Sequence, residues 1–307
     1  MIDLHIHLDG SLGERELNAL AAKQNAKTRV TYPSSPPDPE GGLKAYLERF
    51  RLPLSLLQSP ESVYHAIMLL AERLEKEGLE YAEIRFAPSL STDTGATQSE
   101  IVSAASYAAK KTFERGFPIG IILCCMRGGE RDANLETLRL AEEYVKTASG
   151  IVAIDLAGDE GRFPTEDYRY IFDRAREKGI PFTIHAGEAG GAESVRAALD
   201  MGTKRLGHGV RAVEDPETLR RIISEMVTLE LCYTSNLQTG AWKGGEYPLR
   251  RLMAQGVAVT LNTDNTAVSA TTLRREYDLL AITAEEREIL SANARKAAFK
   301  NKLLEND

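Results

Sequence analysis

The few histidines of this chain are its clearest chemical signal, because four of the five fall at or near the ends of predicted strands. His5 and His7 are two residues apart, so in a strand both imidazoles project from the same face. Two imidazoles on one face suit a divalent transition metal. Such a pair also arises by chance, and the other strand-end histidines, His185 and His208, make it informative. His65 lies in the middle of a predicted helix, and we expect it to be structural.

Two acidic residues complete a candidate hydrolytic site. Glu188 lies three residues after His185, past a glycine turn, and Asp264 follows the last predicted strand. Three imidazoles and one carboxylate can bind a metal ion and leave a position open for water, as hydrolysis requires. Taken singly, Glu188 could be a helix-end carboxylate and His208 a hydrogen-bonded core histidine. Together these residues favour a metal-dependent hydrolase.

Eight short β-rich runs alternate with helical patterns and must position these residues. From the second run to the last, the starts lie about 30 residues apart, the length of one βα unit. The run over 118–126 is almost continuously apolar, which indicates burial on both faces of a parallel sheet. The rhythm predicts an α/β fold, a (β/α)8 TIM barrel, whose strand ends converge at one mouth. The predicted strands are Ile2–His7, Tyr81–Ala87, Pro118–Met126, Ile151–Leu156, Phe182–His185, Arg205–His208, Val227–Cys232 and Val257–Asn262.

The connection after the first strand is much longer than the others. It contains a loop rich in Pro, Gly and Ser over 33–42, followed by an apolar helical stretch, Leu43–Leu57. Residues about 26–60 are therefore either a plain surface excursion or a lid, because insertions after a strand lie on the face of barrel active sites. We expect one domain over residues 1–307, with this helical insertion after strand 1. Further helices are predicted over Glu61–Lys76, Asp132–Thr147 and Thr165–Lys178.

Composition limits the partners. The chain has 38 Lys and Arg against 45 Asp and Glu, a formal charge of −7, which argues against nucleic acid. No apolar run approaches the ~20 residues needed to cross a membrane. Three cysteines form neither a disulfide framework nor a metal-binding pair, so we expect a reducing cytoplasm. The oligomeric state is left open.

Six short motifs carry a resemblance to a known family. They are His5-Ile6-His7-Leu8-Asp9-Gly10, Asp155-Leu156-Ala157-Gly158-Asp159-Glu160, His185-Ala186-Gly187-Glu188, Gly207-His208-Gly209, Thr234-Ser235-Asn236 and Asn262-Thr263-Asp264. In this order they resemble the adenosine deaminase family of the amidohydrolase superfamily, from the first residue to about residue 300. The resemblance implies that one Zn²⁺ per chain, with its water, is bound by His5, His7, His185 and Asp264.

The same resemblance implies the remaining roles. Glu188 would be the acid that protonates purine N1, and His208 would orient the hydroxide that attacks C6 beside Asp264. Gly158 would meet N3 through its backbone amide, and Asp9 would reach the ribose hydroxyls. Apolar contacts to the purine would come from Leu47, Phe50 and Met126. Many relatives carry a second aspartate that contacts N7, and here the position is Asn265.

The function implied is hydrolytic deamination of adenosine or 2′-deoxyadenosine to the inosine form plus ammonia, in purine salvage. The partner is a small-molecule purine nucleoside. Adenine or a modified adenosine is an alternative substrate, and a non-catalytic barrel that binds purine nucleosides is another; Asp9 favours a nucleoside. No lysine near Asp155 could bridge two metals, so one is expected, with iron and cobalt open besides zinc. The HxE and PCxxC signature of cytidine-type deaminases is absent.

Overall fold

The structure, a computed structural model, describes residues 1–24, 29–33, 46 and 48–304. Its parallel strands form two four-stranded sheets, ordered β1-β2-β3-β4 and β5-β6-β7-β8. All eight predicted strands are found, each end within two residues of its expected place. The strands are β1 (Ile2–His7), β2 (Tyr81–Phe86), β3 (Ile119–Met126), β4 (Ile151–Ala157), β5 (Ile184–Ala186), β6 (Arg205–His208), β7 (Thr228–Leu231) and β8 (Ala258–Leu261).

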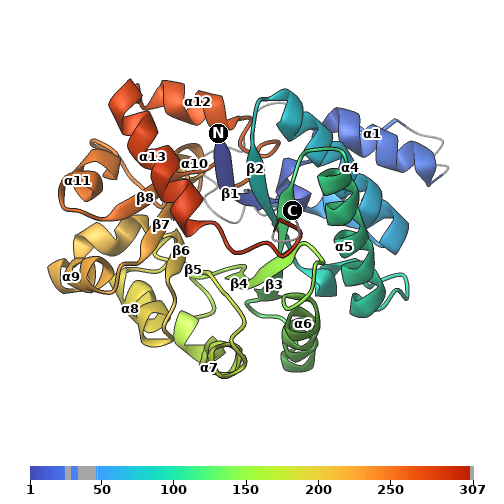
Figure 1. The fold of residues 1–307 in the computed structure, drawn as a ribbon, viewed down its shortest axis with the longest axis horizontal. Helices are drawn as coiled ribbons and strands as arrows, with labels where there is room; N and C mark the ends of the chain where they lie inside the picture. Colours follow the sequence, from blue (N-terminus) through green and yellow to red (C-terminus); the bar gives the residue numbers. More distant parts are fainter. Residues whose placement is uncertain (25–28, 34–45, 47, 305–307) are drawn as a thin grey trace.

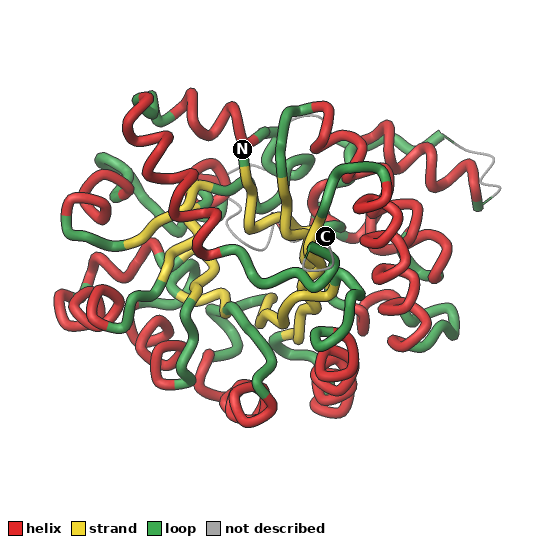
Figure 2. Tube along the Cα trace, viewed as in Figure 1, coloured by secondary structure: helices red, strands yellow, loops and turns green. Residues whose placement is uncertain are grey.

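Two backbone bridges close these sheets into one barrel. Between β4 and β5, the Thr183 amide donates to the Ile154 carbonyl at 3.0 Å. At the other seam, the Asp264 amide donates to the carbonyl of His5 at 2.8 Å, and the amide of His7 donates to Asp264 at 2.7 Å. Figure 2 shows the strands inside an outer ring of helices. The predicted (β/α)8 barrel is confirmed.

The helices between the strands bury one apolar face against the barrel. In α4, Ser59 caps the first turn by accepting from the Ser62 amide at 3.2 Å, and the predicted apolar stripe that includes Ile67 and Leu74 is fully buried. The helices are α1 (Glu14–Lys23), α3 (Arg51–Leu56), α4 (Pro60–Lys76), α5 (Gln98–Glu114), α6 (Arg131–Tyr144), α7 (Arg169–Lys178), α8 (Ala192–Asp200), α9 (Pro216–Ser224), α10 (Tyr233–Gln238), α11 (Leu249–Ala254), α12 (Leu273–Leu279) and α13 (Ala284–Ala297).

The insertion after β1 is described in part. Its helix α3 lies at the mouth of the barrel, and the hydroxyl of Tyr46 shares a 2.7 Å hydrogen bond with Ser269 Oγ, beyond β8. This contact ties the insertion to the barrel end where the histidines lie. The predicted stretch 43–57 is helical at α3 and at residues 46 and 48, and its remainder, with Leu47, falls mostly outside the described residues.

The opposite end of the barrel is closed by the C-terminal segment. The amide of Phe299 donates to Glu83 Oε1 at 2.7 Å, and Arg205 Nη1 donates to the Ala297 carbonyl at 3.1 Å. Figure 1 shows this segment, after α13, crossing the barrel. Ligands therefore enter at the carboxyl ends of the strands. Within the described part of the chain, no helix is long and apolar enough to cross a membrane.

Candidate active site

Four side chains from separate parts of the barrel meet at the carboxyl ends of the strands. His5 and His7 lie on β1, His185 on β5, and Asp264 directly after β8, and their ligand atoms all lie within 4.8 Å of one another. His7 Nε2 is 3.1 Å from His185 Nε2. Asp264 Oδ1 is 3.5 Å from His5 Nε2 and 3.4 Å from His7 Nε2. All four residues predicted as metal ligands are thus brought together.

The position of Asp264 follows from the closure of the barrel. Its backbone bonds to the residues on either side of Ile6 on β1, and its φ of 63° turns the chain inward at the end of β8. Ser235 Oγ donates to Asp264 Oδ2 at 2.5 Å. The hydroxyl thus occupies one carboxylate oxygen, and the other faces the imidazoles.

These residues fit a metal ion. His5 Nε2 is buried, and its contact with Asp264 Oδ1, at 3.5 Å, is with another member of the cluster, as expected of a nitrogen that binds a metal. Ligands about 2.1 Å from a tetrahedral metal lie roughly 3.4 Å apart, close to the 3.1–3.5 Å measured here. The ring nitrogens facing away are held: His5 Nδ1 lies 2.8 Å from Glu230 Oε2, and His185 Nδ1 lies 2.8 Å from Asp155 Oδ2. Each contact directs Nε2 toward the cluster.

Protonation favours metal binding at three of the four residues. Burial lowers the pKa of His5 to about 4 and that of His7 well below its usual value. Burial would raise the pKa of Asp264, but the hydrogen bond and charge of His5 outweigh it and keep the pKa below its usual range. At His185, burial lowers the pKa but the nearby Asp155 outweighs it and raises the pKa above its usual value. Neutral imidazoles and an ionised carboxylate are the forms that bind a metal.

Glu188 and His208 face each other beside the cluster. Glu188 Oε2 lies 3.4 Å from His208 Nε2, and both residues group with Asp264. Asn236 Oδ1 accepts from the Tyr247 hydroxyl at 2.7 Å, so its amide nitrogen is the group 2.9 Å from His208 Nδ1. This donor assigns the proton of the neutral imidazole to Nε2, toward Glu188. Burial raises the pKa of Glu188 despite its histidine neighbour, which favours a carboxyl group able to donate.

A cavity of about 200 Å³ opens onto these residues. Its lining combines the histidines with aromatic and aliphatic side chains, among them Tyr46, Phe50 and Phe86, as a pocket for a planar ring requires. Five of the six residues predicted to bind substrate line it, and the sixth, Leu47, lies outside the described residues. They are Asp9, Phe50, Met126, Gly158 and Asn265.

Two polar side chains of this cavity are suited to select a ligand. Burial raises the pKa of Asp9 to about 6, and the carboxylate accepts only from the neighbouring Gly10 amide, at 3.1 Å, among the described residues. Asn265 Oδ1 is buried without a described hydrogen-bond partner. A Cβ at Gly10 would lie 1.7 Å from this oxygen, so only glycine leaves room for the amide.

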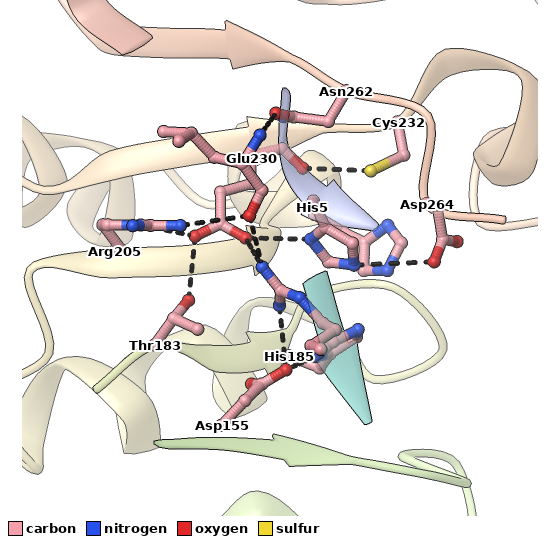
Figure 3. Close-up of polar contacts among 12 residues, drawn as sticks. His5, Asp155, Thr183, His185, Arg205, Glu230, Cys232, Asn262 and Asp264 are labelled. Atoms are coloured by element: carbon pink, nitrogen blue, oxygen red, sulfur yellow. Dashed lines mark hydrogen bonds and ion pairs between the residues drawn. The ribbon is translucent and has the colours of Figure 1, made fainter. Parts of the chain in front are cut away.

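Apart from Asp155, sequence reasoning missed the charged groups beneath the site (Figure 3). Arg85 donates to Asp155 Oδ2 and to Glu230 Oε2, both at 2.8 Å, and is fully buried. Arg205 Nε donates to Glu230 Oε1 at 2.7 Å. Because Asp155 and Glu230 also hold two imidazoles, Arg85 links the supports of His5 and His185. A signal existed, since Glu83, Arg85 and Glu230 are charged residues inside predicted strands that are buried along their length.

A closed parallel barrel with this donor cluster at its mouth is typical of metal-dependent hydrolases. A family model described as adenosine deaminase matches residues 1–306. The chain belongs to the adenosine deaminase family. The family inferred from the six motifs is therefore confirmed.

Individual proteins agree with this assignment. The adenosine deaminase of Haemophilus ducreyi is 46% identical over 97% of this chain and 91% of its own length. Among solved structures, the adenine deaminase from Arthrobacter aurescens has a TM-score of 0.85 and 25% identity, covering 97% of this chain and 93% of that one. At 24% identity, the N6-methyl-AMP deaminase from Arabidopsis thaliana shares the fold, with a TM-score of 0.83 that covers 97% of this chain and 91% of that one.

Proposed function

We propose that this protein hydrolyses adenosine and 2′-deoxyadenosine to inosine and 2′-deoxyinosine, releasing ammonia, in purine salvage. The observation that carries the proposal is the convergence of a candidate metal cluster, a buried acid and an oriented histidine on one cavity that is lined in part by aromatic and aliphatic side chains. The family and the 46% identical adenosine deaminase support the substrate class. A reducing cytoplasm suits the three buried free thiols.

The metal we assign to the cluster is one Zn²⁺ per chain. Three imidazoles and one carboxylate are a donor set that zinc accepts while leaving a position for water. When bound, zinc supplies Lewis acidity that lowers the pKa of a coordinated water toward ~7. The four residues that would hold it are His5, His7, His185 and Asp264.

The acid and the histidine act on the reacting atoms. Purine C6 is a poor electrophile while the ring is aromatic. A proton transferred from Glu188 to N1 makes C6 more electrophilic. His208 Nε2, beside Glu188, can donate a hydrogen bond to the oxygen that attacks C6. That oxygen comes from water and stays on C6, and the amino group leaves as ammonia.

Binding groups complete the assignment. We assign the ribose hydroxyls to Asp9, N3 to the Gly158 amide, and the ring faces to Phe50 and Met126 with Leu47. Asn265 can donate from its amide nitrogen to N7 without taking up a proton, which an aspartate could not do.

Adenine is the second candidate substrate. A solved structure with a TM-score of 0.85 and 25% identity to this chain is named an adenine deaminase. Asn265 would serve a free base as well as a nucleoside. A panel of adenine, adenosine, 2′-deoxyadenosine, N6-methyladenosine and AMP, followed by ultraviolet absorbance, tests the proposal. Highest kcat/KM for adenosine or its deoxy form supports it, a preference for adenine replaces it, and binding without turnover indicates a purine-binding barrel.

A further inference from the structure

The segment that carries Glu188 is wrapped around a buried carboxylate. Glu160, 5% exposed, accepts hydrogen bonds from three consecutive backbone amides: Gly187 at 2.7 Å, Glu188 at 2.9 Å and Ala189 at 2.7 Å. The hydroxyl of Ser194, on α8, donates to the same carboxylate. Successive amides that converge on an anion form a concave binding site in the main chain. Here the anion is part of the protein.

The backbone of this segment is shaped to reach the carboxylate. Gly187 has a φ of 77°, a conformation that favours glycine. A Cβ at Gly190 would lie 2.8 Å from Glu160 Oε1, so this position too must lack a side chain. The pKa of Glu160 lies below its usual value although burial raises it, because the Ser194 hydroxyl and the amide groups favour the ionised form. The carboxylate is thus a charged acceptor, and charge-assisted hydrogen bonds are stronger than neutral ones.

A buried arginine joins this support to the metal cluster. Arg127 Nη2 donates to the carbonyl of His185 at 2.6 Å and to Thr165 Oγ1 at 2.8 Å. Thr165 Oγ1 in turn lies 2.6 Å from Ser194 Oγ. The backbone from His185 to the residues after Glu188 is thereby held from one side by one hydrogen-bonded network.

Glu160 also belongs to the strand end that serves the rest of the site. Asp155, on β4, lies 2.8 Å from His185 Nδ1, and Gly158 lines the cavity. The same short segment thus holds a metal-ligand imidazole, a wall of the substrate cavity and the loop of the acid. Displacement of the Glu188 backbone relative to the substrate cavity would require breaking the hydrogen bonds from the amides of residues 187–189 to Glu160.

We propose that Glu160 is the positioning residue for the acid Glu188, acting through the amides of residues 187–189. This inference deepens the proposed function and rests on it, since it takes Glu188 as the proton donor to N1. A proton donor must lie within hydrogen-bond reach of its acceptor, and a displacement of about 1 Å can cost about 100-fold in rate.

The test is a double-mutant cycle between Glu160→Gln and Glu188→Gln. A glutamine at 160 keeps the shape but turns an N–H₂ group toward amide donors. We expect kcat for adenosine to fall about 10- to 100-fold in the otherwise native enzyme, but less than about 3-fold in the Glu188→Gln background. Bound metal should stay at the native level in all four proteins. Glu193→Gln is the matched control, because Glu193 accepts from a loop amide, that of Gly191 at 2.9 Å, but is exposed.

A second readout needs no activity. Hydrogen exchange of the peptide spanning 187–189 should quicken in Glu160→Gln and not in Glu193→Gln, with or without metal. If Glu160→Gln fails to fold, Ser194→Ala, which leaves the carboxylate charged, enters the same cycle with a smaller expected loss.

The outcomes separate the two proposals. An equal loss in both backgrounds, unchanged exchange at 187–189, or loss of metal would overturn the positioning role. A Glu188→Gln enzyme as active as the native one would instead overturn the assignment of the acid, and with it the proposed function of Glu188.

Discussion

At the scale of single residues, the proposed roles require two neighbouring carboxyl groups in opposite protonation states. Burial raises the pKa of Glu188, whereas Asp264 in the same cluster stays ionised because His5 outweighs the effect of burial. One carboxyl can therefore donate a proton while its neighbour serves as a ligand. The two acids can be distinguished by substitution.

Glu188→Gln preserves the shape of the side chain but removes the proton that N1 requires. We expect kcat to fall by roughly 10²–10⁴-fold while the metal stays bound, because a positioned general acid contributes about that much. Steady-state kinetics and elemental analysis on the same preparation measure both effects. Normal turnover would show that Glu188 is only a loop carboxylate.

Asp9→Ala tests the choice between nucleoside and base. A buried hydrogen bond to a charged group is worth about 1.5–3 kcal/mol, so its loss should narrow the adenosine-to-adenine ratio of kcat/KM by roughly 10- to 150-fold. The kcat/KM for adenine should change little, because adenine has no ribose. The native enzyme and Asp9→Ala are each assayed with adenosine and with adenine. An unchanged ratio of kcat/KM would mean that Asp9 does not bind the ribose.

At the scale of elements, the candidate metal cluster brings together strands that are distant in sequence. β1 supplies His5 and His7, β5 supplies His185, and Asp264 lies at the seam where the segment after β8 bonds back to β1. A bound metal would therefore cross-link the two four-stranded sheets. Removal of the metal should therefore lower the thermal stability of the protein as well as its activity.

Removal of the metal should lower Tm, because a ligand that binds only the folded state stabilises it, by about 4 kcal/mol at 1,000 times its Kd. His185→Ala should lose the metal, and its Tm should no longer respond to a chelator. His65→Ala is the control, since His65 lies on α4 outside the cluster. Thermal unfolding with and without chelator, followed by zinc readdition, measures the effect. A full-activity His185→Ala protein without metal would contradict the ligand set.

At the scale of the whole molecule, the barrel interior is unusual in holding a charged cluster rather than only apolar layers. Arg85 and Arg205 link Glu83, Asp155 and Glu230 across the barrel. Buried charges are tolerated when paired and hydrogen-bonded, and breaking one pair leaves another charge exposed to the apolar interior. The stability of the barrel should therefore depend on pH.

Acid should destabilise the metal-free protein through this cluster. Burial would raise the pKa of Asp155 and Glu230, but neighbouring charges, including Arg85, keep both below the usual range. The unfolded chain then takes up protons before the folded one, so this stability is present above about pH 4–5 and is lost as pH falls further. Urea unfolding from pH 7 to pH 3 measures it.

Glu230→Gln should cost about 3–5 kcal/mol at pH 7 and flatten that pH dependence. The control is Glu136→Gln, which removes a surface partner of Arg139 and should cost no more than about 1 kcal/mol. Equal losses of stability in the two variants would mean that the interior pairs of Glu230 stabilise the fold no more than a surface ion pair does.

The order of strands and the barrel could be predicted from the sequence, and so could the meeting of the histidines and Asp264 at its mouth. Strand signals are local, and in parallel strands of similar length the carboxyl ends meet at one edge, so His5, His185 and Asp264 had to converge. What the tertiary structure alone decided was the set of supports behind them. Arg85 and Glu230 are 145 positions apart, and Glu160 meets Ser194 across 34. No local pattern specifies such pairs, because a buried charge finds its partner only when the barrel closes around it.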